Sequence, residues 1–227
     1  MIPYKDLVPS RRFPFMTVLL IAINVLVFLY QVVLPEPVAT RFVYQYAVIP
    51  LEFRLGHNAE ISPGIPPFLS IFTAMFLHGG WLHLIGNMLY LWIFGDNVEE
   101  VLGPFRFPIF YLLCGVVASL VQIYSNFRSD IPALGASGAI AGILAAYIRL
   151  YPKAKVAVLV PVFYFLRSVI LPAWLVLGLW FLIQILEAHM LPVKDTGGVA
   201  YFAHIGGFVA GLLFLPLLRP RTTRRRA

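Results

Sequence analysis

The sequence predicts an all-α polytopic membrane protein, a six-transmembrane-helix bundle with a short central helix four and both termini inside. Of the 227 residues, 60% are hydrophobic and only 12% are charged, and the mean hydropathy is +0.86. A soluble domain carries about 45–50% apolar and about 25% charged residues. One small domain cannot bury this much apolar surface, so a lipid bilayer is the expected surrounding of the chain.

Six apolar segments account for the predicted helices. A helix needs about 20 mostly apolar residues to cross a hydrocarbon core of about 30 Å. Five segments reach that length, and the fourth in order is shorter because Gly135 and Pro152 bound it. We expect residues 1–218 to form a single membrane domain, with helices at about 14–34, 81–101, 105–124, 135–151, 169–190 and 200–218.

Two connecting segments are predicted to lie at the membrane surface. Residues 35–70 are proline-rich and far longer than a connection requires, which favours a structured first loop. Residues 156–168 are apolar, but they contain Pro161, Arg167 and several β-branched residues. These features favour an interfacial connection over a seventh span.

Basic residues indicate the orientation of the chain. With both termini inside, 12 Lys and Arg residues fall on the inner side and four outside, with Arg167 left out as interfacial. Cytoplasmic loops carry such an excess. The formal charge of +7 and the basic cytoplasmic tail at 219–227 are therefore interpreted as topology signals, and no nucleic-acid partner is expected. This pattern predicts a multi-pass protein of the cell (inner) membrane.

Four strongly polar side chains are predicted to lie at similar depth. His83 and Asn87 lie early in helix two. Ser137 begins helix four, and His204 lies about one turn into helix six. Even-numbered helices of an N-in protein all start at the outer face, and polar groups within a bilayer usually face the bundle interior. We therefore expect these side chains to meet near the outer membrane face.

The length of helix four places Ser137 below the outer surface. Residues 137–151 span about 22 Å at about 1.5 Å per residue, less than the hydrocarbon thickness. With the inner end near Arg149 at the cytoplasmic boundary, the other end stops within the membrane. Non-helical backbone at that depth is tolerated only inside protein or beside a water-filled cavity. An aqueous pocket is therefore expected beside Ser137.

Small residues predict a close crossing of helices four and six. Glycine and alanine at a spacing of four let two helix backbones approach closely in a membrane. Such a crossing would bring Ser137 and His204 within hydrogen-bonding distance. The small residues expected to pack near the site are Gly135, Gly138, Ala141, Gly142, Gly207 and Gly211.

A serine beside a histidine can act as a nucleophile with its general base. The Ser137 N–H, at the positive end of the helix dipole, and the side chains of His83 and Asn87 are the candidate donors to an oxyanion. No acidic residue is placed to orient His204, so the pair is predicted to be a dyad. A lone serine in a membrane helix more often bonds to its own backbone, so the hypothesis depends on the joint occurrence of these residues.

In this combination the sequence resembles the rhomboid family of intramembrane serine proteases. The matching motifs are HGGWLHLIGNMLYLWIFGDNVEE (78–100), GASGAIAG (135–142) and AHIGGFVAG (203–211), in the family's order. The resemblance extends over about residues 14–218. It implies cleavage of single-span transmembrane protein substrates within the lipid bilayer, near the outer face, with no cofactor and no metal.

The resemblance also assigns roles to residues. It implies Ser137 as nucleophile, His204 as general base and acid, and His83 and Asn87 as stabilisers of the oxyanion. It makes helix five a candidate lateral gate. Two departures stand out. Many relatives place an aromatic ring four residues after the nucleophile, against the catalytic histidine, whereas this chain has Ala141 there. The Trp-Arg pair that is common in the family's first loop is also absent.

Two other functions are weighed against this hypothesis. A metalloprotease would use His78, His83 and His204, but the chain has no His-Glu-x-x-His motif, and His78 and His83 are five residues apart, which takes them off one helix face. A transporter usually shows internal repeats and midplane charges, and a non-catalytic relative that binds membrane helices usually lacks the serine or the histidine. The sequence shows neither pattern.

Overall fold

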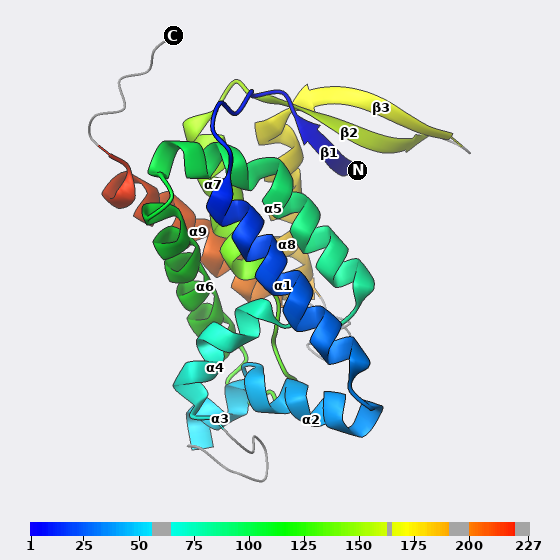
Figure 1. Ribbon diagram of the computed structural model, residues 1–227, viewed down its shortest axis with the longest axis vertical. Coiled ribbons are helices and arrows are strands. Elements are labelled where there is room, and N and C mark those ends of the chain that lie inside the picture. Colours follow the sequence, from blue (N-terminus) through cyan, green and yellow to red (C-terminus); the bar gives the residue numbers. More distant parts are fainter. Residues whose placement is uncertain (56–64, 163–164, 191–199, 221–227) are drawn as a thin grey trace.

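The computed structural model describes residues 1–55, 65–162, 165–190 and 200–220, which form a helical bundle with a small sheet at one end (Figure 1). The shorter helix α7 (Ser137–Leu150) lies among longer ones. These are α1 (Phe15–Val33), α5 (Trp81–Leu102), α6 (Arg106–Ser125), α8 (Ala173–Met190) and α9 (Tyr201–Leu218).

Apolar helices long enough to cross a bilayer make this a polytopic membrane protein. In the described residues, α1, α6, α8 and α9 have the required length and hydropathy. Helix α5 joins α4 (Pro67–Thr73) and the 3-10 turn η1 (Ala74–Phe76) at a bend of 80°, which gives a fifth span if the bent pair counts as one. Helix α7 has 14 residues, or about 21 Å, and is too short to cross a core of about 30 Å.

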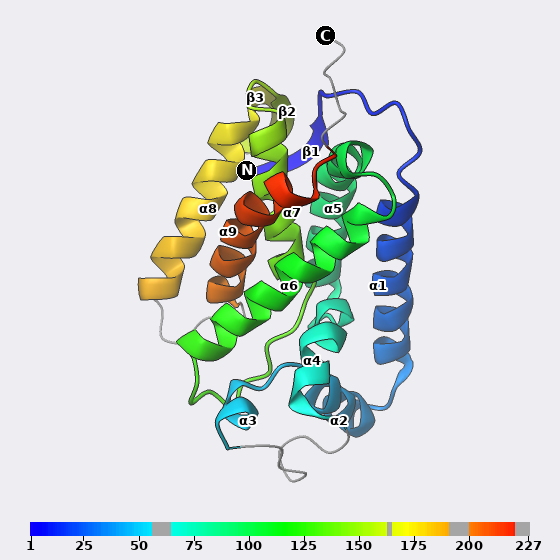
Figure 2. The same cartoon turned by 90° about the vertical axis from the view of Figure 1, so that its left-hand side faces the viewer.

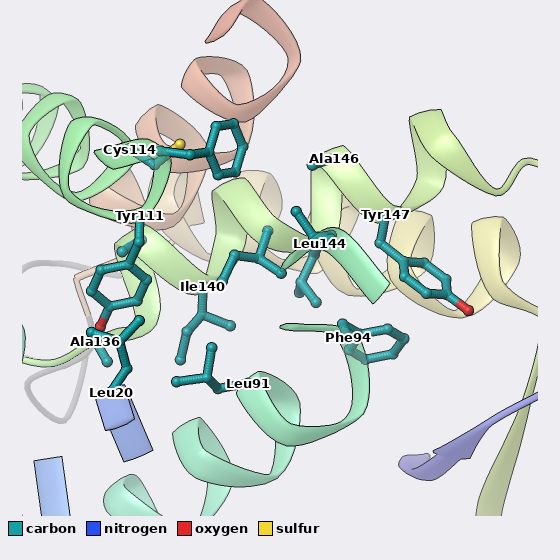
Figure 3. Close-up of a cluster of buried hydrophobic side chains, with 14 of the residues drawn as sticks. Leu20, Leu91, Phe94, Tyr111, Cys114, Ala136, Ile140, Leu144, Ala146 and Tyr147 are labelled. Carbon is teal, nitrogen blue, oxygen red and sulfur yellow. The ribbon is translucent and has the colours of Figure 1, made fainter. Parts of the chain in front are cut away.

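The short helix α7 is the centre of the bundle (Figure 2). It packs against α5, α6 and α9. Eleven of its 14 residues are buried. Ile140 and Leu144 of α7 lie in one apolar cluster with Leu91 and Phe94 of α5 (Figure 3). Most of the surface of α7 therefore contacts protein rather than lipid.

Glycines let the neighbouring helices approach α7 closely. A Cβ at Gly211 of α9 would overlap the carbonyl oxygen of Gly142 of α7. On the α6 side, a Cβ at Gly142 would overlap the Cys114 side chain, and one at Gly138 would overlap that of Ala118. Backbone contact of this kind fixes the relative height of the helices, because no flexible side chain separates them.

The segment between α1 and α5 is folded at the end of the bundle away from the sheet. It contains α2 (Glu36–Tyr46) and α3 (Pro50–Leu55) before α4 (Figure 1). Val48 and Ala133 exchange two backbone hydrogen bonds of 3.0 and 2.8 Å, which tie this segment to the residues just before α7. Residues 56–64 of the predicted first loop lie outside the described residues.

The all-α prediction was wrong at the other end, where three strands form an antiparallel sheet. Strands β1 (Ile2–Asp6), β2 (Lys155–Val162) and β3 (Phe165–Pro172) pair in the order β1-β2-β3. Residues 156–162 and 165–168 of the predicted connection thus lie in the paired strands β2 and β3, and α8 begins at Ala173 rather than near 169. The reason is a run of alternating β-branched residues, which favours a strand and is too short for a spanning helix.

Candidate active site

Ser137 and His204 are in direct contact at the crossing of α7 and α9. The Ser137 Oγ lies 2.7 Å from the His204 Nε2, a hydrogen-bonding distance. Ser137 is the first residue of α7, and His204 lies in the first turn of α9. The His204 side chain is 7% exposed, whereas Ser137 is half-buried. This arrangement leaves the serine accessible and holds the histidine in the protein.

A left-handed turn at Gly135 leads the chain into α7. Gly135 has φ +122°, a region that L side chains rarely adopt, and its N–H donates to the Ala74 carbonyl at 2.8 Å. A Cβ at this position would also lie 2.7 Å from the His83 Nε2. Both the backbone conformation and the space therefore require glycine two residues before Ser137.

Side-chain donors from α5 lie beside that turn. The His83 Nε2 and the Asn87 Nδ2 would be 2.7 and 3.7 Å from a Cβ on Gly135. The Gly79 N–H donates to the His83 Nδ1 at 3.3 Å, so a neutral His83 carries its proton on Nε2, toward Gly135. The Asn87 Nδ2 donates to the His78 Nε2 at 3.0 Å and keeps a second N–H.

These groups line a cavity of about 770 Å³. Ser137, His204, His83 and Asn87 form its polar wall, and Tyr90 and Trp180 are among its aromatic residues. Binding sites commonly combine an apolar cavity with a few convergent polar groups. The cavity is large enough for several residues of an extended peptide.

The packing residues predicted near the site lie where α7 contacts α6 and α9. Gly138, Gly142 and Gly211 lie at the crossings of α7 described above, and Gly207 belongs to the same face of α9. Ala141 is fully buried and packs with Ala145 and Phe208 in a small apolar cluster. Ala141 therefore lies in the α7–α9 interface.

The residue that contacts the other nitrogen of His204 is not among those predicted from the sequence. The His204 Nδ1 lies 2.6 Å from the Oε1 of Gln184, a buried residue of α8. Trp180, one turn earlier, places its ring centroid 5.6 Å from that of the imidazole. A signal was available, because Gln184 is a strongly polar side chain within an apolar segment, the same feature that distinguished His83 and Ser137.

The histidines are not gathered as metal ligands in the described part of the chain. His78 contacts Asn87, whereas His204 contacts Ser137 and Gln184. Within residues 1–55, 65–162, 165–190 and 200–220, no group of three His, Cys, Asp or Glu side chains is placed to hold a metal ion. The geometry of these imidazoles is that of hydrogen-bonding groups.

Comparison with known proteins identifies the family. The family model described as "Rhomboid domain" matches residues 67–221, more than half of the chain. The chain belongs to the rhomboid family. In this rhomboid protein the matched region includes α5, α7, α8 and α9, the four helices that carry the site.

Curated relatives of this rhomboid protein are longer than the chain. Rhomboid protein 1, mitochondrial, of Saccharomyces cerevisiae is 30% identical over 200 residues, which are 86% of this chain and 51% of the relative. Rhomboid-like protein 11, chloroplastic, of Arabidopsis thaliana is 31% identical over 67% of this chain and 53% of the relative. Presenilin-associated rhomboid-like protein, mitochondrial, of Mus musculus is 29% identical over 66% and 37%. The chain spans about half the length of these relatives, or less.

Proposed function

We propose that this rhomboid protein is an intramembrane serine endopeptidase that uses Ser137 and His204. The observation that carries the proposal is the 2.7 Å contact between the Ser137 Oγ and the His204 Nε2 at the wall of a 770 Å³ cavity. A serine hydroxyl is a weak nucleophile until a neighbouring base takes its proton, and His204 is in position to do so. Membership of the rhomboid family agrees with this chemistry.

The proposed reaction has two halves. The His204 Nε2 takes the hydroxyl proton while the Ser137 Oγ attacks the peptide carbonyl carbon and forms a tetrahedral intermediate. The intermediate collapses as His204 returns the proton to the leaving amine, which leaves an acyl-enzyme on Ser137. The His204 Nε2 then takes a proton from a water molecule while the water oxygen attacks the ester carbonyl carbon. The bond between the Ser137 Oγ and the acyl carbon breaks, the proton passes to the Oγ, and the carboxylic acid product leaves.

The negative oxygen of the intermediate needs hydrogen-bond donors that are already in place. The Ser137 N–H, at the N-terminus of α7, is one candidate, and the helix dipole adds to its effect. The His83 Nε2–H and the free Asn87 N–H are the others, since both groups lie beside Gly135. This chemistry uses neither a metal ion nor a cofactor.

The proposed substrates are single-span transmembrane proteins, and the proposed location is the cell membrane. The bundle would cross the bilayer six times, with both termini in the cytoplasm. In the fourth crossing the short helix α7 would stop within the membrane, and the non-helical residues before Ser137 would complete the passage. The excess of Lys and Arg on the side of the termini supports this orientation. The end of α9 and strand β1 lie toward the same end of the bundle, which agrees with it (Figure 2).

The test is cleavage of a panel of single-span substrates by the purified protein in lipid vesicles. Ser137→Ala and His204→Ala should each abolish cleavage, and a serine-directed fluorophosphonate should label the parent chain but not Ser137→Ala. Cys114→Ala is the control, because this buried thiol packs between α6 and α7 and does not contact the dyad. Cleavage that persists in Ser137→Ala would refute the proposal.

A further inference from the structure

Gln184 contacts the imidazole nitrogen that faces away from Ser137. Its Oε1 is 2.6 Å from the His204 Nδ1, and its side chain is only 6% exposed. We propose that Gln184 is a positioning residue that holds His204 in the tautomer needed for a general base. This inference rests on the proposed function, since it assigns a role in the same reaction.

The carbonyl of Trp180 determines which end of the Gln184 amide faces the histidine. The Gln184 Nε2 donates to the Trp180 carbonyl oxygen at 3.2 Å. A carbonyl oxygen accepts only, so the amide nitrogen has to face Trp180 and the amide oxygen has to face His204. The Oε1 then accepts the Nδ1–H of the imidazole.

That hydrogen bond fixes the other nitrogen of the ring. A neutral imidazole with its proton on Nδ1 has a lone pair on Nε2. The Ser137 hydroxyl, 2.7 Å away, donates to this lone pair and is ready to lose its proton. With the amide reversed, Nδ1 would accept and Nε2 would carry the proton, so His204 could not act as the base.

In this chain the His204 imidazole is held by residues of α8 and not by a side chain at position 141 of α7. Ala141 has no side chain that reaches the imidazole, and it is buried against Ala145 and Phe208. Gln184 and Trp180, one turn apart on α8, supply the hydrogen bond and an aromatic wall, with the Trp180 and His204 ring centroids 5.6 Å apart. An amide carries no charge, so Gln184 orients the ring without the cost of burying a carboxylate.

The experiment compares Gln184→Met, which keeps the size and removes the strong acceptor, with Gln184→Glu, which keeps an acceptor. We expect Gln184→Met to lower kcat by about 10- to 100-fold, as the loss of a group that orients a metal-bound histidine does. KM should stay within about twofold, because Gln184 does not line the cavity. Fluorophosphonate labelling of Ser137 should slow by the same factor as kcat, and Gln184→Glu should recover most of the loss.

Gln122→Met is the matched control. The Gln122 Oε1 accepts the Ala203 N–H at 3.2 Å, so this glutamine anchors α9 next to His204 without touching the imidazole. Equal losses of kcat in the Gln122 and Gln184 variants, or an unchanged kcat in Gln184→Met, would overturn the inference. Loss of all cleavage in Ser137→Ala in the same assay would support the serine mechanism whatever the Gln184 variants show. The assay therefore distinguishes a failure of the Gln184 inference from a failure of the proposed function.

A spectroscopic measurement on the parent chain tests the inference without any Gln184 variant. Nitrogen-15 spectra of labelled histidine, with His204 assigned by comparison with His204→Ala, distinguish the two neutral tautomers. We expect the proton on Nδ1 at neutral pH. A proton on Nε2 would overturn the inference whatever the stability of the variants.

Discussion

The backbone of Gly207 in α9 lies directly against the carbonyl group of Gly138 in α7, and a Cβ on Gly207 would overlap that oxygen. Gly138 follows Ser137, and Gly207 lies three residues after His204. The same contact that joins the two helices therefore sets the distance between the two proposed catalytic side chains.

Gly207→Ala should separate the dyad. The added methyl group would meet the backbone of Gly138, which cannot turn aside as a flexible side chain can. Helix α9 therefore has to move away from α7. We expect cleavage to fall at least about 100-fold, because a displacement of about 1 Å at a reacting pair has effects of this size. Gly178→Ala in α8 is the control, since a Cβ there meets nothing within 4 Å. Full activity in Gly207→Ala would show that the helices can shift without disturbing the dyad.

Gly135→Ala should reduce activity through a clash as well as through strain. The methyl group would lie 2.7 Å from the His83 Nε2, and φ of +122° is unfavourable for alanine. Gly103→Ala isolates the strain, because Gly103 also has a positive φ, +82°, but open space around it. We expect Gly103→Ala to lower stability by about 1–2 kcal/mol and to leave the kcat of the folded protein unchanged. Gly135→Ala should lower both the stability and the kcat. Equal kcat values in the two variants would contradict the proposed position of His83 beside Gly135.

His83→Ala and Asn87→Ala should each lower kcat with little change in KM. A side-chain donor to an oxyanion acts mainly in the transition state, and its loss costs about 10²–10³ in kcat. Steady-state kinetics on one substrate would measure both constants. Asn24→Ala serves for comparison, because this buried amide donates to the Leu20 carbonyl within α1, at 2.7 Å. A rise in KM with constant kcat would place the two α5 residues in substrate binding instead.

Asp6 should make the stability of the sheet end depend on pH. Burial raises the pKa of the Asp6 carboxyl above its usual value, although the hydroxyl of Tyr147 and the amide of Asn97 donate to it and lower the pKa in part. The folded state therefore binds the proton more tightly than the unfolded state, and the stability it contributes at low pH is lost as the pH rises through the folded pKa.

Asp6→Asn removes that titration and keeps an acceptor for Tyr147. We expect the melting temperature of the parent to fall relative to Asp6→Asn as the pH rises from about 3 to about 7. Thermal unfolding in detergent at several pH values would measure the difference. A difference that stays constant over this range would show that Asp6 does not cause the dependence.

The long helices could be predicted from the sequence because their boundaries are local. The segments predicted at 14–34 and 81–101 correspond to α1 (Phe15–Val33) and α5 (Trp81–Leu102). The sheet could not be predicted in this way, because β1 pairs with a strand about 150 residues later. The alternating β-branched residues favour a strand locally, but they do not indicate which distant segment will pair with it.

The proposed site was partly predictable for the same reason. Ser137 and His204 occur in glycine-rich motifs whose small residues predict a close crossing, and the structure places the two side chains 2.7 Å apart. Gln184 has no such motif around it. Which face of α8 meets His204 depends on the rotation of that helix against α9, and this rotation is a property of the packed bundle.

Because β1 pairs with β2, the sheet cannot form until β2 has been synthesised. Ile2 pairs with Leu159, and Asp6 bonds to Asn97 and Tyr147. A ribosome adds about 5–20 residues per second, so the first strand waits about ten to thirty seconds for its partner to be made. By then α1, α5, α6 and α7 have all been synthesised. Strand β1 can therefore dock only after these helices have been made, and its Asp6 then contacts α5 at Asn97 and α7 at Tyr147.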